Sequence, residues 1–159
     1  NAPGQVVVSG ERAAVEAAES IARELGAKRV VVLPVSVASH CPLMAEAAAG
    51  LQAVLDSPAY REAFRDPRPP LVSNVDARLL ATATDCRREL VEHLTSGVDW
   101  VAAVEGMAGR GVTTFVEVGP GRVLTGLIRR IVPGREVLAT DDPGAPDRLL
   151  VPFTPTVTA

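Results

Sequence analysis

The sequence predicts an α/β fold in which β-strands and α-helices alternate along the chain. Short β-branched runs such as "QVVVSG" and "KRVVVLPVSV" recur, and most are followed by segments whose apolar residues have helical spacing. Glycine and proline stand at many boundaries between the two patterns. Alternating strands and helices pack in layers. The length of 159 residues fits one globular domain or a large part of one.

The first third of the chain is expected to contain two strands separated by a helix. Residues 5–10 form a short apolar run that ends in a turn, which predicts a buried strand. The helix follows and stops at Gly26, and its apolar face consists of Val15, Ala18, Ala22 and Leu25. Residues 28–37 predict the second strand, in which Pro34 marks a sheet edge or a strand break because proline cannot donate to a central ladder.

The middle of the chain predicts two helices on either side of a short strand. The first begins at Pro42, since proline suits the first helical turn, and its apolar side comprises Met44, Ala47, Ala48, Leu51, Val54 and Leu55. A proline-rich loop at 66–70 leads to a strand at 71–75. Residues 86–94 then predict a helix with Leu90 and Leu94 directed inward.

The C-terminal part predicts a helix, a strand and a second helix. The first helix covers 98–111, and the strand covers 112–119. After a Gly-Pro-Gly turn, the second helix reaches Ile131, and its apolar stripe consists of Leu124, Leu127, Ile128 and Ile131. Residues 141–159 are proline-rich and predict a poorly ordered tail.

Composition argues against several classes of function. The net charge is -3 and the charged residues are interspersed, which argues against a nucleic-acid partner. Two cysteines are too few for a disulfide framework or a zinc site, and no apolar run approaches the ~20 residues that span a bilayer. We therefore expect no metal, no membrane segment and a reducing, cytoplasmic compartment.

His40 is the first candidate for chemistry. It follows a predicted strand and precedes a helix, where open α/β sheets gather their sites, and histidine is the usual proton carrier near neutral pH. A packed or capping histidine is the alternative. No serine lies in a G-x-S-x-G elbow to serve as its nucleophile, and Cys41 should point to the opposite face of the chain.

The segment "EVGPG" (117–121) opens a helix and could hold an anion on its exposed backbone N–H groups. The alternative is a tight strand-to-helix turn in which glycine permits close packing, with Glu117 structural or paired with an arginine. The segment lacks the G-x-G-x-x-G spacing, which makes a nucleotide-binding domain a distant alternative.

Five segments, in this order, resemble the malonyl-CoA:acyl carrier protein transacylase family, which includes the acyltransferase domains of fatty-acid and polyketide synthases. The match is to the C-terminal half of the family only. The segments are "NAPGQVVVSG" (1–10), "LPVSVASHCPLM" (33–44), "NVDA" (74–77), "LVEHLTSGVDW" (90–100) and "FVEVGPGRVLTGLIRRI" (115–131).

The resemblance implies the C-terminal part of an α/β-hydrolase-like large lobe plus part of an inserted, ferredoxin-like small lobe. Residues 1–36 would finish the small lobe, residues 37–140 would form the C-terminal part of the large acyltransferase lobe, and residues 141–159 would be the tail. The active site of the family lies in the cleft between the lobes.

The resemblance also implies a ping-pong transfer of a malonyl group from CoA to the phosphopantetheine thiol of acyl carrier protein, with no bound cofactor. A serine in a "G-H-S-x-G" elbow forms the acyl-enzyme, and His40 matches the family's general base and acid. The backbone carbonyl of His93 would orient His40. Asn1 and Gln5 match a segment beside the CoA or pantetheine arm, and Ser39 matches a position that tracks the acyl group, malonyl or methylmalonyl.

The chain departs from the family pattern in two ways. His93 stands where the family commonly has glutamine, and Gly97 replaces a proline, which should loosen the loop beside His93. The serine elbow, a loop of the oxyanion hole and the arginine that pairs with the malonyl carboxylate have no counterpart here. We therefore expect acyl carrier protein and the missing N-terminal half as partners, and negligible activity of the chain alone. The alternative is a non-catalytic module that binds carrier protein or another subunit.

Overall fold

The computed structural model describes residues 1–144, which divide into two compact units. One unit comprises Asn1 and Gln5–Ala103, and the other comprises Ala2–Gly4 and the chain from Val104 onward. Both helices and strands are present, as the predicted α/β class requires. No helix among the described residues is long and apolar enough to cross a bilayer.

The first unit is mostly helical. Its elements are α1 (Arg12–Glu24), the 3-10 helix η1 (Pro42–Met44), α2 (Ala45–Leu55), α3 (Pro58–Ala63), β1 (Leu71–Val72), β2 (Leu79–Leu80) and α4 (Ala83–Thr95). The helix predicted before Gly26 and the helix predicted to begin at Pro42 are thus confirmed, the second with a 3-10 first turn.

The two strands predicted in the first third of the chain are wrong. Residues 5–10 and 28–37 contain no strand, and all but one of their valines are exposed, for example Val6 by 83% and Val32 by 66%. A strand satisfies its backbone N–H and C=O groups only through a neighbouring strand, and neither segment has such a neighbour among the described residues. Leu25 was predicted on the inner face of α1 but is 83% exposed, because no described element covers it.

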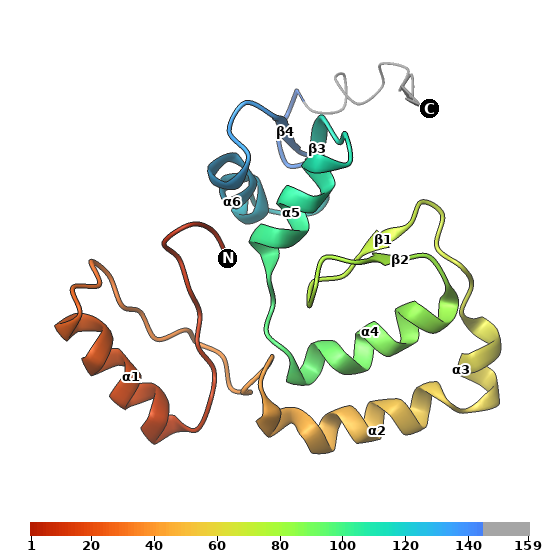
Figure 1. Ribbon diagram of the computed structural model, residues 1–159, viewed down its shortest axis with the longest axis horizontal. Coiled ribbons are helices and arrows are strands. Elements are labelled where there is room, and N and C mark those ends of the chain that lie inside the picture. The colour runs from red at the N-terminus through yellow and green to blue at the C-terminus, as the bar shows by residue number, and fades with distance from the viewer. Residues whose placement is uncertain (145–159) are drawn as a thin grey trace. The chain divides into compact units, whose positions relative to one another are not determined.

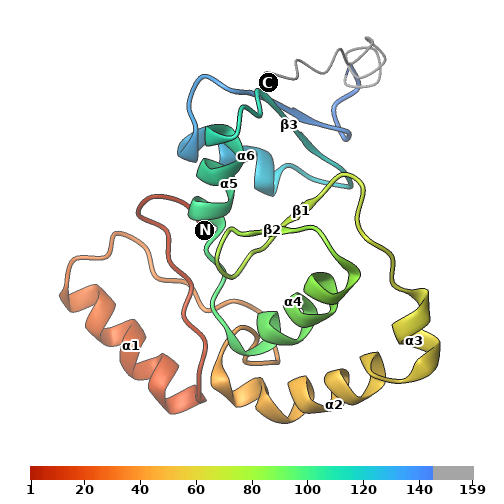
Figure 2. The same cartoon turned by 45° about the vertical axis from the view of Figure 1, so that its right-hand side comes forward.

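Helices α2 and α4 pack side by side (Figures 1 and 2). Ala48 and Leu55 of α2 are buried, as their place on the predicted apolar side requires. On α4 the prediction for Leu90 is wrong, because this leucine is 45% exposed whereas the preceding Glu89 is buried. The spacing of apolar residues could not predict the burial of Glu89, because this side chain is buried with polar partners.

Strands β1 and β2 form an antiparallel hairpin in which Leu71 pairs with Leu80 and Val72 with Leu79. The strand predicted at 71–75 ends at Val72 because Ser73 begins a turn. The Ser73 hydroxyl accepts hydrogen bonds from the N–H groups of Val75 (3.0 Å) and Asp76 (3.2 Å). Serine side chains of this kind offer the backbone an alternative to the strand ladder.

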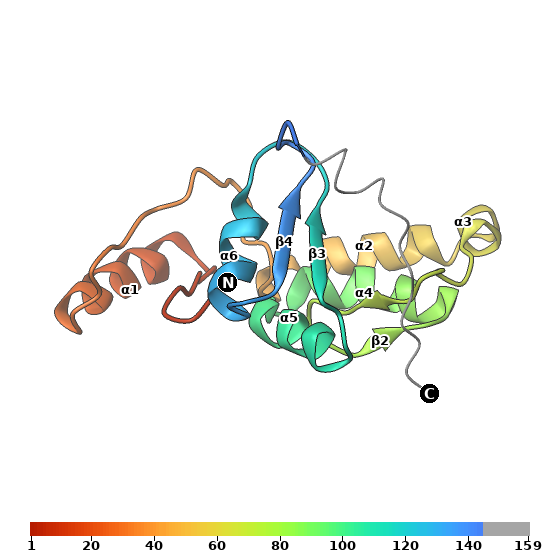
Figure 3. The same cartoon turned by 90° about the horizontal axis from the view of Figure 1, so that it is seen from above.

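The second unit contains a β-α-β crossover. Helix α5 (Trp100–Gly109) leads into it, and β3 (Thr114–Glu117), α6 (Val123–Ile131) and β4 (Glu136–Ala139) follow. Strands β3 and β4 are parallel neighbours (Figure 3), with Phe115 opposite Val137. The buried apolar side chains of this unit are Ala2, Val104, Ala108, Phe115, Ile128, Ile131, Val137, Leu138 and Ala139.

The predicted elements of this region are confirmed with shorter bounds, whereas β4 was not predicted. Leu124, placed on the apolar stripe of α6, is 39% exposed. At the start of the predicted tail, the Asp141 carboxylate accepts a hydrogen bond from Gly121 N (3.1 Å), and Asp142 pairs with Arg122 at 2.7 Å. Residues 145–159 lie outside the described part of the chain, so the expectation for them stays a prediction.

Candidate active site

His40 lies in the loop before η1 and is held by the last turn of α4. Its backbone N–H donates to the carbonyl of Leu94 (3.1 Å), and its ring Nδ1 lies 2.7 Å from the carbonyl oxygen of His93. The residue has a φ of 67°, in the left-handed region where histidine occurs more often than most side chains. The structure thus brings together the two histidines singled out in the sequence.

The hydrogen bond between Nδ1 and the His93 carbonyl defines the tautomer of the His40 ring. A carbonyl oxygen only accepts hydrogen bonds, so Nδ1 carries the proton, and in the neutral ring Nε2 keeps a free lone pair. The last carbonyls of a helix lack intrahelical partners and form the negative end of its dipole, which stabilises a nearby cation. His40 is therefore arranged to accept a proton at Nε2.

The side chain of His93 also contacts His40, which sequence reasoning missed. The centroids of the two rings are 4.4 Å apart, with an angle of 42° between the planes. Burial, followed by the charge of His40, lowers the pKa of His93, and Glu89 opposes the shift. The two residues are separated by 53 positions. No local pattern could have indicated their ring contact, although they are the only two histidines of the chain.

The other predicted site residues lie in two places. The backbone nitrogen of Asn1 donates to the carbonyl of Gln5 (3.1 Å), which closes a short turn in which both residues are exposed. Ser39 is half-buried directly before His40. The Cys41 thiol is buried and donates to the carbonyl of Ala38 (3.1 Å), away from any role as a nucleophile for His40.

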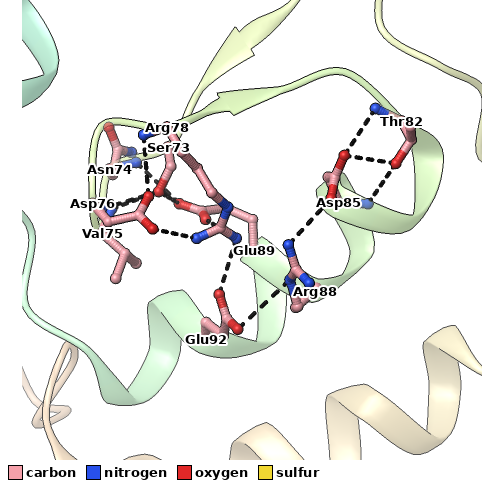
Figure 4. Close-up of polar contacts among 10 residues, drawn as sticks. All are labelled: Ser73, Asn74, Val75, Asp76, Arg78, Thr82, Asp85, Arg88, Glu89 and Glu92. Atoms are coloured by element: carbon pink, nitrogen blue, oxygen red, sulfur yellow. Dashed lines mark hydrogen bonds and ion pairs between the residues drawn. The ribbon is translucent and has the colours of Figure 1, made fainter. Parts of the chain in front are cut away.

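A buried carboxylate anchors α4 to the β1–β2 turn (Figure 4). Glu89 accepts hydrogen bonds from the Ser73 hydroxyl (2.8 Å) and from Asn74 N (3.0 Å), and its second oxygen lies 3.3 Å from the Arg78 guanidinium. Ser73 is fully buried. Because α4 carries the carbonyls that hold His40, this cluster indirectly supports the site.

The N-terminal end of α4 has a capping box, also drawn in Figure 4. The Thr82 hydroxyl accepts from Asp85 N (3.1 Å), and the Asp85 carboxylate accepts from Thr82 N (3.2 Å). These bonds satisfy backbone donors that the first turn of a helix otherwise leaves free. Helix α4 is therefore fixed at its start by side chains from its own sequence.

The "EVGPG" segment is a structural turn. The Glu117 carboxylate accepts from the backbone N–H groups of Leu124 (3.1 Å) and Thr125 (2.7 Å), and the hydrogen bonds from Thr125 lower the pKa of Glu117. Gly119 and Gly121 have φ angles of 127° and 88°, which favour glycine. The Glu117 carboxylate thus occupies the backbone N–H groups at the start of α6 that the predicted anion site would need.

The described residues contain no group of three or more His, Cys, Asp and Glu side chains that could hold a metal ion.

No protein-family model matches the chain. Among curated proteins, the malonyl CoA-acyl carrier protein transacylase of Escherichia coli K12 is 44% identical over 145 residues, which are 91% of this chain and 46% of that protein. A solved acyl carrier protein S-malonyltransferase from Vibrio cholerae is 40% identical, with a TM-score of 0.79, and the match covers 88% of this chain and 44% of that one.

The chain matches the C-terminal half of malonyl-CoA:acyl carrier protein transacylases. It spans less than half the length of these relatives. A third similar protein is a malonyl-transacylase solved in complex with its type II polyketide synthase acyl carrier protein. That structure is 43% identical, with a TM-score of 0.74, and the match covers 84% of this chain and 42% of that one.

Gly97 is the second place where the sequence departs from the transacylase pattern. It is exposed, and a Cβ atom built on it would meet no atom within 4 Å. The loop around it is tied down nearby, since Ser96 N donates to the carbonyl of Glu92 (3.0 Å) and Asp99 N to that of Asn74 (2.8 Å). The hydrogen bond between the His93 carbonyl and His40 is therefore formed although residue 97 is glycine.

Proposed function

We propose that this chain is the C-terminal portion of an acyltransferase that moves a malonyl group from CoA to the phosphopantetheine thiol of acyl carrier protein, in fatty-acid or polyketide synthesis. The observation that carries the proposal is the His40 ring, whose Nδ1 is bound to the His93 carbonyl at 2.7 Å while Nε2 is left as the base. Similarity to transacylases over 91% of the chain supports the reaction class.

The reaction has two half-reactions that share one base. His40 Nε2 takes the proton from a serine hydroxyl as the serine oxygen attacks the malonyl thioester. Collapse of the tetrahedral intermediate expels the CoA thiolate, which takes the proton from Nε2. The carrier thiol then gives its proton to Nε2 and attacks the acyl-serine, and the departing serine oxygen regains the proton. The serine belongs to the N-terminal half of the enzyme, outside these 159 residues.

The imidazolium that forms in each half-reaction is stabilised by its position. The carbonyls of His93 and Leu94 both point to His40 at the C-terminal end of α4. A cation at an exposed helix C-terminus gains typically about 0.3–1 kcal/mol at low ionic strength. This stabilisation applies to the protonated ring and therefore to the steps in which the proton is on Nε2.

The remaining assignments follow from the same proposal. Residues 1–36 finish a ferredoxin-like small lobe, and residues 37–140 belong to the α/β-hydrolase-like large lobe. The exposed valines at 6–8 and 31–32 support pairing of these segments with strands of the N-terminal half, which would complete their ladders. Asn1 and Gln5 border the pantetheine arm, and Ser39 borders the acyl group. Two free cysteines favour a reducing cytoplasmic compartment.

Complementation tests the proposal. The 159-residue chain is mixed or co-expressed with the N-terminal half of the E. coli transacylase, and transfer of radiolabelled malonyl from CoA to holo acyl carrier protein is measured. We expect transfer by the mixture and none by either half alone, because each half lacks part of the dyad. A mixture that assembles and binds carrier protein without any transfer would instead favour a non-catalytic binding module.

A further inference from the structure

The side chain of His93 touches the proposed base in addition to orienting it through the backbone. Residue 93 contributes its carbonyl oxygen to His40 Nδ1 at 2.7 Å, and it places its imidazole 4.4 Å from the His40 ring. The two contacts act on different motions. The hydrogen bond fixes the direction of Nδ1, but acceptor geometry at a carbonyl is broad, so the bond alone leaves the ring free to tilt. The neighbouring His93 ring, inclined at 42° to the His40 ring, limits this motion.

His93 is suited to this role because it stays neutral. Its Nε2 is buried and has no hydrogen-bond partner among the described residues. A neutral imidazole can leave one nitrogen unprotonated there, whereas the cation would bury an N–H donor without an acceptor. A second positive charge would also face the imidazolium of His40, and Glu89 is the acidic group that acts in the opposite direction. Burial and His40 keep the pKa of His93 below its usual range.

We propose that the His93 side chain is a positioning residue for the transfer reaction, whose neutral ring packs on His40 and keeps Nε2 in the orientation that accepts the proton. The inference rests on the proposed function of His40. Misplacement of a catalytic group by about 1 Å can cost on the order of 100-fold in rate, so a packing contact on the base has a measurable effect.

The experiment compares His93→Ala with His93→Phe in the full chain. Both variants keep the backbone carbonyl, and only phenylalanine keeps a flat ring. Because the chain has two histidines, either variant leaves His40 as the single histidine signal in two-bond 1H-15N spectra, which report the tautomer of its ring. We expect His93→Ala to lower the fraction of the Nδ1–H tautomer, and His93→Phe to restore most of it.

Kinetics of the complemented enzyme give the second readout. His93→Ala should lower kcat about tenfold with KM nearly unchanged, since the contact orients the base and does not bind substrate. His93→Phe should recover most of this loss. Leu90→Ala, which removes an exposed side chain from the same helix, is the matched control and should leave kcat and the His40 tautomer unchanged.

The results separate this inference from the proposed function. If His93→Ala leaves both the tautomer and kcat as in the parent chain, or if His93→Phe is as impaired as His93→Ala, the packing role is wrong. If His40→Ala leaves transfer unchanged, the proposed function fails, while the tautomer spectra still report whether the His93 ring positions His40.

Discussion

His40 shows how a single residue can be held by main-chain atoms of a distant helix. Its left-handed backbone costs free energy, of order 1–3 kcal/mol for sparsely populated conformations, and such strain is typically found at functional sites. Two hydrogen bonds to consecutive carbonyls of α4 hold the residue in this conformation. These bonds use main-chain atoms, so a histidine at position 93, where the resemblance implies glutamine, does not remove the orientation of His40.

Glu89 joins α4 to the turn between β1 and β2. Replacing it by glutamine keeps the shape but sets an amide NH2 group against donors from Ser73, Asn74 or Arg78. Loss of one partner in a buried, charge-assisted cluster should lower the free energy of unfolding by roughly 2–4 kcal/mol. Urea titrations followed by the fluorescence of Trp100, the single tryptophan, measure this loss.

Glu62→Gln is the control for this prediction, because Glu62 is an exposed acid on α3 and its loss should change stability by less than about 0.5 kcal/mol. Equal, small effects of Glu89→Gln and Glu62→Gln would show that the cluster does not anchor α4.

At the scale of elements, most helices could be predicted from sequence, but α3 was not predicted and the strands predicted at 5–10 and 28–37 are wrong. The spacing of apolar residues within α1, α2 and α6 is a local property, and the start of α4 is encoded by Thr82 and Asp85. Strand formation at 5–10 and 28–37 depends on a partner that the described residues do not supply. The strand predicted at 71–75 is too long because the Ser73 side chain competes with the ladder, and its partner β2 was not predicted.

Helix α6 should lose stability in acid because Glu117 caps it. The folded pKa of Glu117 is lowered, so its contribution is complete above about pH 4.3, the ordinary pKa of glutamate, and is lost as the pH falls through the folded value. Glu117→Gln should therefore speed amide exchange of Leu124 and Thr125 at pH 7 relative to the parent chain. This difference should shrink as the pH falls towards 3.

The control is Glu105→Gln on α5, an exposed acid of the same unit, which should leave exchange at these two amides unchanged. A difference between Glu117→Gln and the parent chain that stays constant from pH 7 to 3 would contradict the capping role.

At the scale of the whole molecule, the chain matches one half of a transacylase, and His40 is proposed as one half of a Ser-His dyad. The local sequence made His40 a candidate, but its role and its carbonyl partner were predicted only through resemblance to the family, since the two histidines lie 53 residues apart. The ring contact of His93, the burial of Glu89 and the capping by Glu117 needed three-dimensional structure. The exposed valines at 6–8 and 31–32 form the surface that the proposed N-terminal half would cover.

The rate of malonyl transfer by the complemented enzyme, compared between the parent chain and His40→Ala, tests the central claim most directly. General acid–base catalysis typically contributes 10²–10⁴-fold, so we expect the rate to fall by about that factor while the two halves still assemble. Assembly is checked by size-exclusion chromatography of the mixture. A His40→Ala mixture that assembles and transfers malonyl at the rate of the parent chain would contradict the account.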